Sequence, residues 1–130
     1  MASSSAEFHE SEDRLRSETM DYHRAIVSLM EELEAVDWYN QRIDATDDPD
    51  LAAILAHNRD EEKEHSAMAL EWLRRRDAEL DRFLRQYLFS EGSITTVEEA
   101  TESAIEERDS GAGGNGASLS IGSLRGRSNR

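Results

Sequence analysis

The residues of this chain best suited to chemistry are glutamates and one histidine on helical sequence. Glu62 and His65 stand three residues apart in the stretch RDEEKEHSAMALEW, residues 59–72. Residues three apart share a helix face, so a carboxylate and an imidazole would point the same way. The chain has no cysteine, so a bound metal would take such oxygen and nitrogen ligands, which suit iron, manganese or zinc.

These groups fall inside apolar stripes, which indicate packing faces. The stripe around the first pair consists of Leu51, Leu55, Asn58, Glu62, His65, Ala69 and Trp72. An earlier stripe consists of Ala25, Leu29, Glu32, Leu33 and Val36. Both follow steps of three or four residues, the spacing of one helix face. Each of two helices is therefore expected to carry an acid on its buried side.

A two-helix hairpin would bring these acids together. The pattern predicts helices over about 11–44 and 49–76, with the only proline, Pro49, in the first turn of the second helix. Asp47 or Asp48 is expected to cap that helix. The predicted fold class is all-α: an antiparallel hairpin, followed by a short helix over residues 78–87.

The helix register predicts that Glu32 faces Glu62 and His65. Both sets lie roughly 22 Å from the turn at about 1.5 Å of rise per residue. Two buried carboxylates and one imidazole cannot satisfy one another without shared protons or a cation, so a metal ion would resolve the conflict. The alternative is an ordinary ion pair at a wet edge, with Glu32 turned outward.

A second copy of the chain is expected to complete the site. Carboxylate bundles hold two metals with two sets of a Glu and a Glu-x-x-His, and this chain supplies one set. A two-fold axis through the metal pair would supply the other set and make a four-helix bundle. A hairpin of this length also buries too little apolar surface to be stable alone.

Composition divides the chain into a head at 1–12, a helical domain at 13–92, a linker at 93–118 and a tail at 119–130. The Ser-rich head and the tail are expected to be disordered and the Gly-rich linker flexible, although residues 95–109 could form an acidic helix. The net charge of −14 argues against nucleic acid and anionic membranes as partners. The chain lacks a membrane span and a signal peptide, which predicts a soluble cytoplasmic protein.

Three stretches resemble the encapsulated ferritins: HRAIVSLMEELEAVDWYNQR at 23–42, LAHNRDEEKEHSAMALEWLRR at 55–75 and RQYLFSEG at 85–92. The resemblance implies a half-ferritin that dimerises and assembles into a ring of five dimers. It also implies a ferroxidase that binds two Fe²⁺ per dimer. The residues it implies are Glu32, Glu62 and His65 as di-iron ligands, Tyr39 and Trp38 beside them, and Glu31 and Glu34 as an iron-uptake site.

The tail sequence LSIGSLR, residues 119–125, resembles the targeting peptides of encapsulin cargo. Leu119, Ile121 and Leu124 are expected to dock to an encapsulin shell protein and so to place the chain in the shell lumen. Two other functions remain open alongside the ferroxidase. One is a dimanganese or peroxide-consuming enzyme, and the other is a non-catalytic metal-binding or structural cargo.

Overall fold

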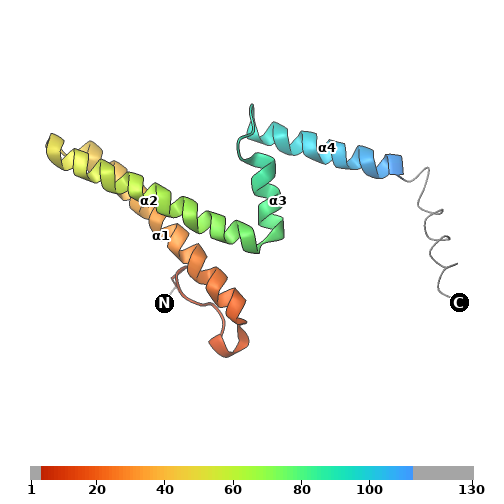
Figure 1. Cartoon of the computed structure of the whole chain (residues 1–130), viewed down its shortest axis with the longest axis horizontal. Coiled ribbons are helices and arrows are strands. Elements are labelled where there is room, and N and C mark those ends of the chain that lie inside the picture. Colours follow the sequence, from red (N-terminus) through yellow and green to blue (C-terminus); the bar gives the residue numbers. More distant parts are fainter. Residues whose placement is uncertain (1–3, 113–130) are drawn as a thin grey trace, which may run out of the picture. The chain divides into compact units, whose positions relative to one another are not determined.

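The structure, a computed structural model, describes residues 4–112. Its elements are η1 Glu12–Arg14, α1 Ser17–Ala45, α2 Pro49–Arg76, α3 Ala78–Tyr87 and α4 Ile94–Ala112 (Figure 1). No strand occurs in this part of the chain, which confirms the all-α prediction. The chain divides into two compact units within α3, one ending at Arg82 and the other beginning at Phe83. The expected targeting segment lies outside the described residues.

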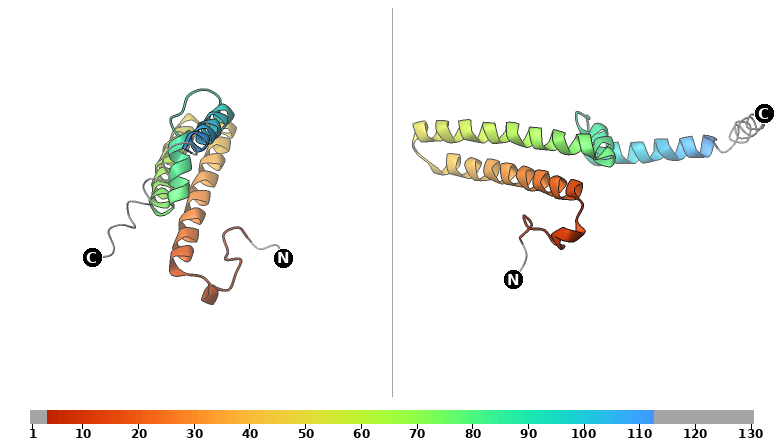
Figure 2. Two further views of the ribbon diagram at one scale, coloured as in Figure 1. Left: turned by 90° about the vertical axis from the view of Figure 1, so that its right-hand side faces the viewer. Right: turned by 60° about the horizontal axis from the view of Figure 1, so that its bottom comes forward.

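The first unit is built on the antiparallel hairpin of α1 and α2, which lie side by side in every view (Figure 2). Asp48 caps α2, because its side chain accepts hydrogen bonds from the backbone N–H groups of Asp50 at 2.9 Å and Leu51 at 3.2 Å. Pro49 occupies the first helical position, where its missing N–H costs nothing. The turn therefore starts α2 at a defined residue and fixes its register against α1.

One predicted helix boundary is wrong. The first helix begins at Ser17 rather than near residue 11, because Leu15 and Arg16 are extended and separate it from η1. Helix propensity alone does not fix the residue at which a helix starts. Within the expected linker, residues Ile94–Ala112 form α4, as the alternative of an acidic helix over residues 95–109 predicted. In the expected head, Phe8 packs on the His23 ring with centroids 4.6 Å apart.

The hairpin has a thin core. Among the described residues only Leu73 and Ser66 are buried, with 3% and 7% of their surface exposed. Leu33 and Leu51 belong to the predicted buried stripes, yet both are exposed. A helix in a two-helix hairpin has one partner, so only part of its apolar stripe is covered. Within residues 4–112, no helix is long and apolar enough to cross a membrane.

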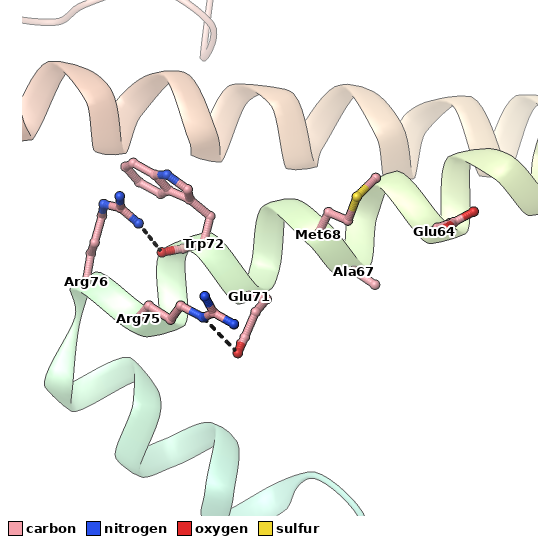
Figure 3. A pocket seen from close by; sticks show the side chains of 7 residues that line it. All are labelled: Glu64, Ala67, Met68, Glu71, Trp72, Arg75 and Arg76. Carbon is pink, nitrogen blue, oxygen red and sulfur yellow. Dashed lines mark hydrogen bonds and ion pairs between the residues drawn. The ribbon is translucent and has the colours of Figure 1, made fainter.

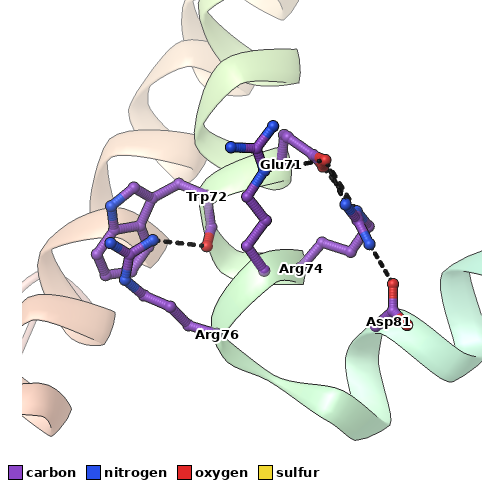
Figure 4. A network of polar contacts seen from close by, with 6 residues as sticks. Glu71, Trp72, Arg74, Arg76 and Asp81 are labelled. Carbon is purple, nitrogen blue, oxygen red and sulfur yellow. Dashed lines mark hydrogen bonds and ion pairs between the residues drawn. The ribbon is translucent and has the colours of Figure 1, made fainter.

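Polar contacts stabilise the bend between α2 and α3. The Tyr22 hydroxyl donates to the Asp77 carboxylate at 2.7 Å, and Asp77 also accepts the backbone N–H of Leu80 at 3.0 Å. Arg74 bridges Glu71 and Asp81 (Figure 4). These contacts attach the start of α3 to both helices of the hairpin.

Candidate metal centre

The structure brings Glu32 of α1 together with Glu62 and His65 of α2. His65 Nδ1 lies 3.3 Å from Glu62 Oε2 and 3.7 Å from Glu32 Oε2. One potential ligand atom from each residue lies within 4.8 Å of the other two. This arrangement is what the helix register predicted. The function of the three residues as metal ligands stays a prediction.

The three side chains differ in the fraction of their surface that is exposed to solvent. The side chains of Glu32 and Glu62 are 28% and 23% exposed, whereas that of His65 is 47% exposed. The two carboxylates therefore lie between the helices, and the imidazole lies at the uncovered edge. The ion-pair alternative required Glu32 to turn outward into solvent, and Glu32 does not.

The electrostatics of the cluster reflect the crowding of its acids. A hydrogen bond with Glu62, together with partial burial, raises the pKa of Glu32. The same hydrogen bond lowers the pKa of Glu62. A hydrogen bond to Glu62 also raises the pKa of His65. A divalent cation would compete with protons for the same oxygen and nitrogen donors.

Other predicted residues of α1 lie outside this cluster. Glu31 and Glu34 are exposed. Tyr39 is half-buried, and the Arg42 guanidinium lies 5.5 Å from its ring centroid. Trp38 is exposed. None of these four candidates belongs to the group of possible metal ligands within residues 4–112.

Two features of α2 were not predicted from the sequence. Ser66, a small polar residue beside the candidate ligands, is buried, and its only signal was its position within the helix. An open groove is lined by Glu64, Ala67, Met68, Glu71, Trp72, Arg75 and Arg76 (Figure 3). Arg76 covers the Trp72 ring with its guanidinium 3.8 Å from the centroid. The groove contains none of the three candidate ligands, so it is not the metal centre.

Comparisons with known proteins identify the family. The EncFtn-like family profile matches residues 7–91. The chain is 57% identical to the encapsulated ferritin-like protein of Rhodospirillum rubrum, over 97% of this chain and 93% of that protein. It is 39% identical to the encapsulin nanocompartment cargo protein EncC of Myxococcus xanthus, over 55% of each.

A solved structure agrees with the fold. The crystal structure of protein ne0167 from Nitrosomonas europaea matches with a TM-score of 0.66 at 60% identity, over 67% of this chain and 96% of that one. The family profile covers more than half of the sequence, and the Rhodospirillum rubrum relative covers nearly all of it. The chain therefore belongs to the EncFtn-like family of encapsulated ferritin-like proteins.

Proposed function

We propose that this protein is a ferroxidase that oxidises Fe²⁺ to Fe³⁺ at a di-iron centre formed by two copies of the chain. The observation that carries the proposal is the convergence of Glu32, Glu62 and His65 from two helices in a ferritin-like chain. Two carboxylates and an imidazole are a common iron ligand set in carboxylate bundles. Three donors leave positions free for a second chain and for an oxidant.

The uncovered face of the hairpin supports the two-chain part of the proposal. Exposed apolar residues occur along both helices: Ile26, Met30 and Leu33 on α1, and Leu51, Ile54 and Met68 on α2. On α2, Met68 lies one helical turn after the half-exposed His65. A second hairpin packed on this edge would cover exposed apolar surface and bring two ligand sets together. Each dimer would then bind two iron ions as its substrate.

The donor set favours the oxidised ion. Anionic oxygen ligands stabilise Fe³⁺ more than Fe²⁺, so each ferrous ion gives up one electron to an oxidant more readily. We assign Glu62 the bridging position; its Oε2 lies 3.3 Å from His65 Nδ1 on the same helix. Glu32 and His65 would bind terminally. The three ligands bind metal in their deprotonated forms, so protons would compete with iron for the centre.

We infer that the chain resides inside an encapsulin shell, because one relative is an encapsulated ferritin-like protein and another is an encapsulin nanocompartment cargo protein. Leu119, Ile121 and Leu124 would dock to the shell protein, because apolar side chains on an extended backbone can fill separate pockets. Several tails on one assembly would add avidity even where each binds weakly. Oxidised iron would then be stored in the shell lumen.

Anaerobic Fe²⁺ titration with native mass spectrometry, followed by oxygen-uptake measurements, tests the ferroxidase. The parent is expected to bind two iron ions per dimer and to consume O₂ on addition of Fe²⁺. Glu32→Ala, Glu62→Ala and His65→Ala should each impair oxidation, the Glu62 change most, because a bridging ligand serves both ions. His57→Ala is the matched control, since His57 pairs with Glu61 on the same helix and outside the cluster.

The results separate the proposed function from its alternatives. Iron binding without oxidation would favour a non-catalytic cargo. Faster turnover with peroxide than with O₂ would favour a peroxide-consuming enzyme, and preferential activity with Mn²⁺ a dimanganese one. If the three variants match the parent in both binding and oxidation, the centre is assigned to the wrong residues.

A further inference from the structure

Ser66 is the only buried polar residue in the part of the chain that the structure describes. It follows the candidate ligand His65 directly and lies one helical turn after Glu62. Its hydroxyl donates to the backbone carbonyl of Glu62 at 2.8 Å. This bond satisfies the hydroxyl inside α2, so Ser66 needs no polar partner on α1.

We propose that Ser66 is a positioning residue that sets the spacing of α1 and α2 at the metal centre. Its small side chain lets the helices come close enough for Glu32 to reach Glu62 and His65. The inference rests on the proposed function, because it concerns the iron ligands. It assigns Ser66 no contact with iron or with the oxidant.

The geometry shows why spacing matters for one ligand in particular. Glu62 and His65 are both on α2, so their relative position does not depend on the distance between the helices. Glu32 is the only ligand from α1, and its Oε2 already lies 3.7 Å from His65 Nδ1. The distance between packed helices, about 8–10 Å between axes, depends on the size of the side chains at the contact. A larger residue at position 66 would therefore remove Glu32 from the cluster first.

A graded series at position 66 tests size against hydrogen bonding. Ser66→Ala keeps the side chain small and removes the hydroxyl, Ser66→Thr adds one methyl group and keeps the hydroxyl, and Ser66→Leu is much larger. Ala52→Leu is the matched control, since half-buried Ala52 lies close to four helical turns before Ser66, on the same side of α2. It adds similar bulk to the hairpin away from the ligands. Far-UV circular dichroism and thermal unfolding report folding, and anaerobic titration reports Fe²⁺ affinity.

Affinity should follow side-chain size at position 66. Ser66→Ala should bind Fe²⁺ as the parent does, and Ser66→Leu about 10- to 100-fold more weakly, as for other residues that orient ligands. Ser66→Thr should fall between them and provides a mildly changed variant if the Leu variant does not fold. Ala52→Leu should unfold at a lower temperature and keep its affinity for Fe²⁺. Loss of affinity in Ser66→Ala, or equal loss in Ala52→Leu, would overturn the inference.

A double-mutant cycle with Glu32→Ala separates this inference from the proposed function. In the parent, Glu32→Ala should weaken Fe²⁺ binding. In the Ser66→Leu background, or the Thr background if needed, it should weaken binding much less, because Glu32 is already displaced. An undiminished effect in that background would refute the positioning role alone. No effect in the parent would refute the proposed centre instead.

Discussion

Removing the Asp48 side chain should destabilise the hairpin by a calculable amount. Asp48 accepts two backbone hydrogen bonds, from Asp50 and Leu51, at the start of α2. Loss of such a cap costs about 1 kcal/mol, within a range of about 0.5–2 kcal/mol. For a domain of about 60–100 residues, each kcal/mol shifts the melting temperature by roughly 4–8 °C. We therefore expect Asp48→Ala to melt about 4–8 °C below the parent.

Thermal unfolding followed by far-UV circular dichroism measures this shift. All samples need one protein concentration, because the melting temperature of an oligomer depends on concentration. Asp47→Ala is the matched control, since Asp47 carries the same charge one residue away and makes neither of these hydrogen bonds. Asp48→Asn keeps an acceptor oxygen without the charge and should retain most of the stability. Equal shifts in Asp47→Ala and Asp48→Ala would show that net charge at the turn, not the cap, matters.

Two further predictions concern iron and a third concerns the shell. Replacing both Glu31 and Glu34 with Ala should slow iron uptake, measured by stopped-flow, or alter the oligomer distribution, measured by native mass spectrometry. Loss of paired iron in this variant would mean that these acids are ligands. The pKa of His65 is raised, so a proton competes with Fe²⁺ for His65 to a pH above the ordinary 6.5, and Fe²⁺ affinity should rise as pH rises through that range. Over the same rise in pH, the metal-free protein should lose the stability that protonated His65 contributes to the fold. His57→Ala should leave the pH dependence of Fe²⁺ affinity unchanged. Deleting residues 118–130 should abolish co-purification with a co-expressed encapsulin and leave oxidation in solution intact, and continued loading would place the shell contact in the helical domain.

Helix periodicity predicted most of the hairpin because local signals there agree with one another. Pro49 and the aspartates before it indicated the turn, and counting outward from it placed Glu32 opposite Glu62 and His65. The hairpin has a simple topology, since α1 packs on the helix that follows it in the sequence. A short turn with a strong cap leaves little freedom in register.

Periodicity could not define which part of each stripe is covered. It grouped Leu33 and Leu51 with the buried face, whereas both are exposed in a single chain. Apolar spacing reports every surface that is buried in the assembled protein, without separating contacts within one chain from contacts between copies. The burial of Ser66 was not predicted for a related reason, because a small polar residue inside a charged stretch is usually exposed to solvent.

Assembly and metal binding are coupled if the site is shared between chains, as we propose. A single hairpin buries only two residues and leaves His65 of the cluster at an open edge. Bringing two such clusters together without metal would add carboxylate repulsion to the interface, whereas two bound cations would compensate that charge. An ion that binds only the dimer must shift the equilibrium toward the dimer, by an amount that grows with ion concentration. The thin core of the single chain then has a functional consequence. A hairpin that was stable alone would depend less on dimerisation and on iron binding for its stability.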